Sequence, residues 1–149
     1  MFATSPQVSQ AQVVPLSLLP PALEAPRLII PLVIEEPPEP TVKELVMDYA
    51  IQYGVDVRLA LAIAQCESGL DPTAENPSPH SSAGGVFQFL DSTWAKTIEL
   101  LNWPEDTDKL DAKKNVEAGI FLLKKDGTRH WLESKSCWSK MLNGAGLNP

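Results

Sequence analysis

The chain has few of the features that mark a nucleic-acid-binding or membrane-spanning protein. Of its 149 residues, 12 are lysine or arginine and 19 are aspartate or glutamate, so the formal charge is -7 and the pI is about 4.7. Because a phosphate backbone is bound by basic patches, this balance disfavours a nucleic-acid partner and broad attraction to an anionic membrane. No apolar run reaches the roughly 18 residues that a spanning helix requires. We expect neither a nucleic-acid partner nor a membrane span.

Residues that bind metal ions are also scarce. The two cysteines form no CxxC pair, and two histidines are too few for a zinc site without clear partners. The segment DTDKLD at 106–111 lacks the glycine and the terminal glutamate of an EF-hand loop. We therefore expect no metal and no cofactor.

Proline is concentrated at the start of the chain. Nine of the fourteen prolines lie in residues 1–40, and proline removes backbone donors and restricts the residue before it. We predict that 1–40 is a proline-rich extended arm or linker and that 41–149 is one domain. The opening MFATSPQ lacks the basic region of a secretory signal, so no clear signal peptide is visible.

After Pro40 the pattern becomes helical. The capping-box sequence TVKE at 41–44 predicts a helix that ends at about Tyr53, and Asp56 can cap a second helix over 57–68; a glycine follows each helix. The rest of the expected elements are a strand or extended loop at 86–89, a helix over 93–101 capped by Asp91 or Ser92, a helix over 112–125 capped by Asp111 and stopped by Gly127, and a last helix over 130–138. The fold class is mainly α with a small extended patch.

An ionisable residue ends the second expected helix. Ala60, Ile63, Ala64 and Glu67 follow the i, i+3, i+4, i+7 spacing, so Glu67 extends the apolar stripe. Burial and the negative end of the helix dipole both disfavour a carboxylate there. The raised pKa would suit a general acid. The alternative is a last-turn glutamate that extends into water.

A glycine-rich segment follows at 82–89, SAGGVFQF. Its glycines allow a backbone to approach a ligand closely, and it presents Gln88 between Phe87 and Phe89. Amides, backbone groups and ring faces are the types that bind sugars. The alternative is a tight turn before a core strand, with Phe87 or Phe89 in the core.

The order of these segments resembles the lysozyme-like superfamily, specifically the soluble lytic transglycosylase domain. Its signature is a helix ending in E-S-G, an N-P or D-P pair, G-A-x-G-L-M-Q, and a further helix. The matching segments here are ESGLDP at 67–72 and SAGGVFQ at 82–88, together with YGVD at 53–56, LAIA at 61–64, STW at 92–94 and NVEAG at 115–119. The resemblance covers about residues 41–138.

The resemblance implies a lysozyme-like fold and cleavage of the MurNAc–GlcNAc β-1,4 bond of peptidoglycan glycan strands. It makes Glu67 the acid that protonates the glycosidic oxygen and then acts as a base. It implies that Gln88 and the backbone around Phe87 contact the N-acetylated sugar. It also implies that Ser81 or Ser82 is the serine near the glutamate.

The chain departs from the family's closing Y-N-A-G motif. The nearest match, LNGAG at 142–146, has a leucine where the family has a tyrosine. Asp71 and Asp91 are the candidates for a second carboxylate, although a turn suits Asp71 and a helix N-cap suits Asp91. With no clear second carboxylate, the resemblance implies a single-acid mechanism that gives 1,6-anhydromuramoyl ends. If Asp71 or Asp91 faces the cleft, lysozyme-type hydrolysis becomes the better interpretation.

The two cysteines are expected to pair. Cys66 adjoins Glu67, and Cys137 lies in the last expected helix, so a disulfide would close a loop of about 70 residues. The alternative is two buried free thiols.

Three hypotheses follow for function. The first is a peptidoglycan-cleaving enzyme, and the second is a non-catalytic peptidoglycan-binding or assembly module. The third is a plain helical interaction domain, which would leave Glu67 exposed with no groove beside it. We expect action outside the cytoplasm, in the periplasm, in the cell wall or as a secreted protein, and we expect a monomer.

Overall fold

The computed structural model describes residues 36–78 and 80–144. The chain divides into two units, Met1–Pro37 and Pro38–Pro149. The predicted proline-rich arm at 1–40 lies almost wholly outside the described residues, as does the end of the predicted 41–149 domain.

Local sequence sets the ends of the first two helices. In α1 (Val42–Tyr53) the Thr41 hydroxyl accepts a hydrogen bond from the Glu44 N–H, and the Glu44 carboxylate accepts one from the Thr41 N–H. In α2 (Val57–Ser68) the Asp56 carboxylate accepts hydrogen bonds from two N–H groups of the first turn. A glycine with φ near +66° to +69° ends each helix, a conformation that other residues adopt at a cost. The capping predictions are confirmed.

Among the later helices, some predicted caps and bounds are correct and others are not. They are α3 (Asp91–Leu100), α4 (Ala112–Asp126), the 3-10 helix η2 (Gly127–Trp131) and α5 (Lys135–Asn143). The Asp111 cap of α4 is confirmed, since its carboxylate accepts from the Lys114 N–H at 2.8 Å.

Two predictions about these helices are wrong. Leu90 is the N-cap of α3 and makes no side-chain cap bond, so Asp91 and Ser92 are already helical residues. The single last helix over 130–138 is replaced by η2 and α5. The reason is that Trp131 is turned into the core, 4% exposed, and the chain must turn before α5 begins.

The extended patch after α2 is small. Among the described residues it contains no strand, only the isolated bridges Glu75↔Gly84 and Gly84↔Phe89. Gly84 and Phe89 exchange backbone hydrogen bonds of 3.1 and 2.9 Å, which close a tight turn. Segment 86–89 is therefore a turn, and the predicted mainly-α fold is confirmed.

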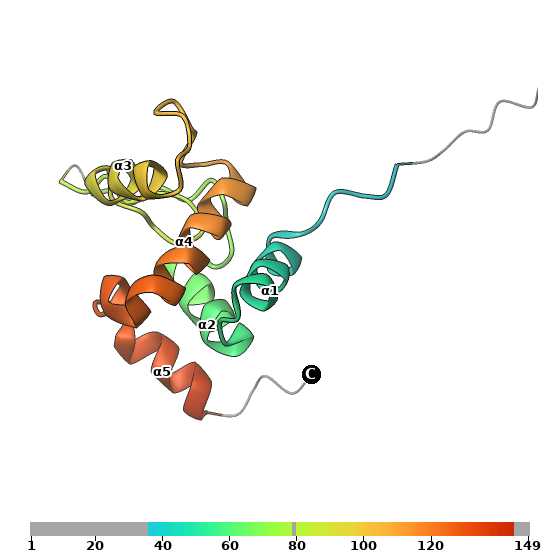
Figure 1. Cartoon of the computed structure of the whole chain (residues 1–149). Coiled ribbons are helices and arrows are strands. Elements are labelled where there is room, and N and C mark those ends of the chain that lie inside the picture. The colour runs from blue at the N-terminus through green and yellow to red at the C-terminus, as the bar shows by residue number, and fades with distance from the viewer. Residues whose placement is uncertain (1–35, 79, 145–149) are drawn as a thin grey trace, which may run out of the picture. The chain divides into compact units, whose positions relative to one another are not determined.

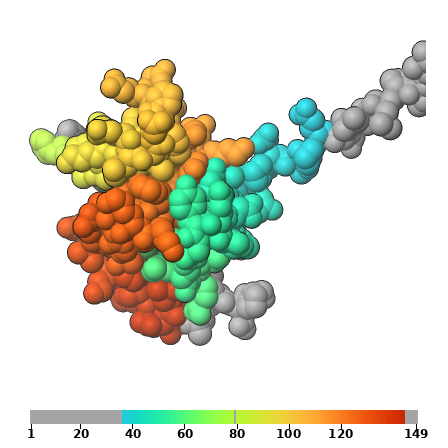
Figure 2. Space-filling model, viewed as in Figure 1, coloured from blue at the N-terminus to red at the C-terminus, as the bar shows by residue number. Residues whose placement is uncertain are grey.

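Within Pro38–Pro149, α1 packs against both α2 and α4. Helix α5 packs on α2, and α3 contacts α4 (Figure 1). In the space-filling view, α3 and the loop after it form one end of this unit, and α5 forms the opposite end (Figure 2). Of the segment that joins α2 to α3, residues 84–87 and 89 are buried, whereas the described residues of 71–82 are exposed or partly exposed.

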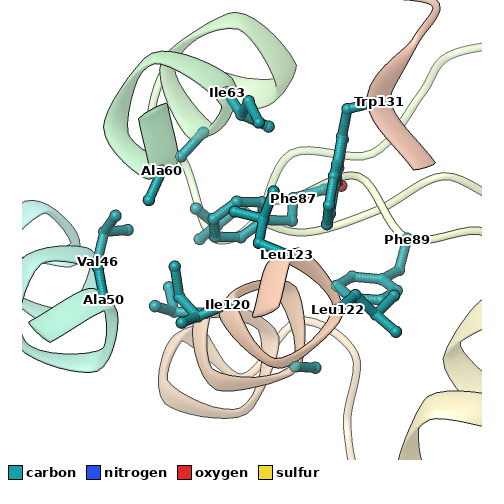
Figure 3. Close-up of a cluster of buried hydrophobic side chains, with 14 of the residues drawn as sticks. Val46, Ala50, Ala60, Ile63, Phe87, Phe89, Ile120, Leu122, Leu123 and Trp131 are labelled. Atoms are coloured by element: carbon teal, nitrogen blue, oxygen red, sulfur yellow. Dashed lines mark hydrogen bonds between the residues drawn. The ribbon is translucent and has the colours of Figure 1, made fainter. Parts of the chain in front are cut away.

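Phe87 is the centre of the core. Its side chain, 1% exposed, lies among residues from α1, α2 and α4 and beside Trp131 (Figure 3). The Phe87 and Trp131 rings meet edge to face with centroids 5.6 Å apart. On α4, Gly119 leaves room for the Phe87 ring, because a Cβ there would lie 2.5 Å from two ring carbons.

The close contact at Gly119 predicts the effect of one added methyl group. Gly119→Ala would force the Phe87 ring out of its place, so the free energy of unfolding should fall by about 1–3 kcal/mol despite alanine's higher helix propensity. Urea unfolding measures this change. Lys113→Ala, at an exposed position of α4, is the control, and an equal effect in both variants would contradict the packing argument.

The predicted disulfide is confirmed. Cys66 and Cys137 are bonded, which joins the last turn of α2 to the first turn of α5. The two residues are 71 positions apart, so the crosslink restricts a long loop of the unfolded chain.

Removing the crosslink should therefore be costly. The double variant Cys66→Ala/Cys137→Ala should lose about 4 kcal/mol of unfolding free energy on the chain-entropy model. Chemical denaturation of wild type with and without reductant should give the same loss, and reductant should leave the double variant unchanged. A wild type that is insensitive to reductant would contradict this prediction.

Candidate functional site

Glu67 lies on the buried stripe of α2, as its spacing predicts. Ala60, Ile63 and Ala64 are fully buried, and Glu67 in the last turn is half-buried. Burial raises the pKa of the Glu67 carboxyl above its ordinary value of 4.5. The side chain therefore keeps its proton to a higher pH than an exposed glutamate.

A serine that lies 67 residues later in the sequence contacts this carboxyl group. Ser134 Oγ donates a hydrogen bond of 2.5 Å to Glu67 Oε1, and it also lies 3.2 Å from the Trp131 carbonyl oxygen. The hydrogen bond lowers the pKa of Glu67 and so partly opposes burial. Sequence reasoning missed Ser134, because residues 131–138 match no family motif and only the fold brings them to α2.

Gln88 occupies a strained position in the turn after Gly85. Its φ of 50° lies in the left-handed region. Its amide nitrogen donates to the carbonyl oxygens of Ala74 at 3.0 Å and Gly85 at 2.9 Å. Both amide hydrogens thus stabilise the loop, and Oε1 is the side-chain atom that remains to accept a hydrogen bond from a ligand.

Phe87 belongs to the core, which is the alternative that the sequence left open. Its N–H donates to Asn115 Oδ1 at 2.8 Å, and its carbonyl accepts from the Trp131 indole N–H at 3.1 Å. Because its ring is also buried, the contribution of Phe87 is to hold the position of the next residue, Gln88.

The end of α2 and the glutamine turn are joined directly. The Ser68 hydroxyl, next to Glu67, donates to the Val86 carbonyl at 2.9 Å. Trp131 forms a second link, because its indole binds Phe87 and its carbonyl lies beside Ser134. The fold therefore brings Glu67 and the segment that carries Gln88 into one hydrogen-bonded network.

The two serines predicted to lie near the glutamate make their hydrogen bonds within the loop. Ser81 Oγ accepts from the Ala83 N–H at 3.2 Å, and Ser82 Oγ accepts from the Asp91 N–H at 3.0 Å. The serine that contacts Glu67 is Ser134.

Neither candidate for the second carboxylate resembles Glu67 in its surroundings. Asp71 is exposed, and its Oδ1 accepts from the N–H and the hydroxyl of Thr73, both at 2.8 Å, which lowers its pKa. Asp91 is exposed and pairs with Lys109, whose ammonium group also binds the Ser82 carbonyl. Asp71 thus stabilises a turn, and Asp91 fixes the start of α3.

A small hollow borders the glutamine turn. Its polar lining comes from Gln88, Thr93 and His130, and its apolar lining comes from residues such as Leu90 and Trp131. Glu67 is not among the residues that line it. Mixed polar and aromatic walls of this kind suit part of a sugar ring.

In residues 36–78 and 80–144, no three His, Cys, Asp or Glu side chains gather closely enough to hold a metal ion. The helices described there are too short or too polar to cross a bilayer.

The buried carboxyl predicts a pH-dependent cost to stability. Because the folded pKa of Glu67 is raised, its contribution to stability is complete below about pH 4.5 and is lost as the pH rises through the folded pKa. Glu67→Gln removes this loss, so the variant should gain stability relative to wild type between about pH 4 and pH 7.

Urea unfolding at both pH values tests this prediction. The exposed Glu99→Gln is the control for the loss of one carboxyl charge. A constant difference between Glu67→Gln and wild type at the two pH values would contradict the burial argument.

One comparison with known proteins identifies a family. The family model described as Transglycosylase SLT domain matches residues 44–131, more than half of the chain, and this range includes Glu67 and Gln88. No curated protein and no solved structure matches the chain. SLT domains are lytic transglycosylases, lysozyme-like glycosidases that act on peptidoglycan, which implies action outside the cytoplasm. The chain belongs to the transglycosylase SLT domain family.

Proposed function

We propose that this domain cleaves the β-1,4 bond between MurNAc and GlcNAc and forms 1,6-anhydromuramoyl ends, with Glu67 as its single acid and base. The observation that carries the proposal is the half-buried Glu67 carboxyl, whose pKa is raised by burial and which receives a hydrogen bond from Ser134. A glutamate that keeps its proton toward neutral pH is what protonation of a leaving oxygen requires.

The first step breaks the glycosidic bond. Glu67 gives its proton to the glycosidic oxygen, and the GlcNAc unit leaves with a hydroxyl group. The carbonyl oxygen of the MurNAc N-acetyl group attacks C1 from the opposite face and balances the charge that develops there. This assistance replaces the second carboxylate of other glycosidases.

The second step closes the anhydro ring. The Glu67 carboxylate accepts the proton of the MurNAc C6 hydroxyl, and O6 attacks C1 while the bond from C1 to the acetamido oxygen breaks. Glu67 is protonated again, and no water is consumed. Ser134 can serve both states of Glu67, because its hydroxyl can donate to the carboxylate or accept from the acid.

The settings of the other carboxylates support the single-acid mechanism. Asp71 is committed to the turn with Thr73, and Asp91 is paired with Lys109 at the start of α3. Both side chains are exposed, so neither has the half-buried setting of Glu67. The acetamido group of the substrate is then the group that can stabilise C1.

Gln88 is proposed to position the sugar. Its amide nitrogen is used within the loop, so its Oε1 would accept a hydrogen bond from an N-acetyl N–H or a hydroxyl. The two hydrogen bonds from the amide nitrogen hold the side chain in place, which reduces the entropy cost of binding.

The decisive experiment combines clearing of a cell-wall suspension with mass spectrometry of the released muropeptides. Wild type should clear the suspension and release products that are one water lighter than hydrolysed ones. Glu67→Gln should lower the rate by at least about 100-fold, because general acid catalysis supplies a factor of this size. Glu99→Gln, at an exposed position of α3, should retain the wild-type rate.

Each alternative has its own outcome. Full activity in Glu67→Gln would refute the assigned acid. Products with hydrolysed ends would refute anhydro-ring formation and indicate lysozyme-type hydrolysis. Binding to insoluble peptidoglycan without any released muropeptide would indicate a binding or assembly module.

A further inference from the structure

Ser134 is placed as a helix cap but does not act as one. It precedes α5 at the N-cap position, where a serine hydroxyl normally accepts a hydrogen bond from an N–H of the first turn. Its hydroxyl makes no such bond, and the Cys137 N–H binds the Ser134 backbone carbonyl at 2.8 Å instead. The hydroxyl is therefore available to Glu67, 67 residues away in sequence.

The surroundings of Ser134 hold this hydroxyl in place. The Trp131 carbonyl lies 3.2 Å from Ser134 Oγ and also accepts the Trp138 indole N–H at 3.0 Å. One turn along α5, Cys137 is bonded to Cys66, the residue before Glu67. The disulfide between residues close to them in sequence, together with the hydrogen bonds at the Trp131 carbonyl, holds the serine beside the glutamate.

The hydroxyl has one proton and two acceptors. When Glu67 is ionised, Ser134 donates to Oε1. When Glu67 carries its proton on Oε2, the donation to Oε1 is kept, and the proton lies on the oxygen that Ser134 does not bind. A proton on Oε1 would end this donation, because Oε1 would then donate to Ser134 Oγ and the Ser134 hydroxyl would have to turn to the Trp131 carbonyl. The donation to Oε1 therefore persists through both states of Glu67 when Oε2 carries the proton.

We propose that Ser134 is a positioning residue, which orients Glu67 and assigns Oε2 as the atom that exchanges the proton with the substrate. The inference rests on the proposed function of Glu67 as the acid and base. The disulfide from Cys66 to Cys137 holds the first turn of α5, and with it Ser134, against the end of α2.

Other charged groups do not complicate the effect of Ser134. The causes that act on the Glu67 pKa are burial, which raises it, and the Ser134 hydroxyl, which lowers it. The charged side chains that flank the pair in sequence are exposed: Glu133 and Lys135 on either side of Ser134, and Asp71 after α2. Cys66 and Cys137 do not titrate because they are bonded.

The kinetic test compares Ser134→Ala with Ser134→Thr. The alanine variant should lower kcat by about tenfold or more with little change in KM, because a misoriented acid reduces productive geometry. The basic limb of the kcat–pH profile of this variant should move to higher pH, because the hydroxyl that lowers the Glu67 pKa is gone. The threonine variant keeps a hydroxyl and should restore both kcat and the pH profile. Ser136→Ala, at an exposed position of α5, is the matched control.

A second measurement does not depend on turnover. Carboxyl ¹³C NMR titration should give a higher Glu67 pKa in Ser134→Ala than in wild type or Ser134→Thr, and circular dichroism checks that each variant is folded. Equal pKa values and equal kcat in wild type and Ser134→Ala would overturn the role of Ser134. A raised pKa in Ser134→Ala, with no muropeptide released even by wild type, would instead overturn the proposed function.

Discussion

The arrangement of the whole site depends on one buried amide, that of Asn115 in α4. It is fully buried, accepts the Phe87 N–H and donates to the Lys109 and Gly84 carbonyls. These bonds fix segment 84–89 against α4, so the Phe87 ring enters the space above Gly119. Once Phe87 is fixed, its carbonyl determines the position of the Trp131 indole. An apolar residue at 115 would leave the Phe87 N–H and the Lys109 carbonyl without their partner, at a cost of about 1–3 kcal/mol each. The Gly84 carbonyl would still accept the Phe89 N–H.

The proposed chemistry rests on two opposing influences on the pKa of Glu67. Burial disfavours the charged carboxylate, and the Ser134 hydroxyl favours it. A carboxyl with burial alone would hold its proton firmly, which would hinder the proposed later role as a base. A carboxyl in open water would lose the proton too early. In the proposed cycle, the intermediate setting lets one side chain give and regain a proton.

Sequence predicted the features that are decided locally. The caps at Thr41, Asp56 and Asp111 depend on residues within one turn, and the stripe position of Glu67 depends on helical spacing. The start of α5 and the contact of Ser134 with Glu67 could not be predicted, because both follow from the burial of Trp131 by residues far away in the chain. The prediction that Asp91 caps α3 was wrong for a similar reason. The partner of its carboxylate is Lys109, which lies 18 residues further along the chain.

The region shared with the family ends at residue 131, before Ser134 and Cys137. The proposed acid therefore lies inside the matched range, while its hydroxyl partner and Cys137 of the disulfide lie in the segment that follows. A substitution in that segment would change the acidity of Glu67 without altering any residue of the matched range.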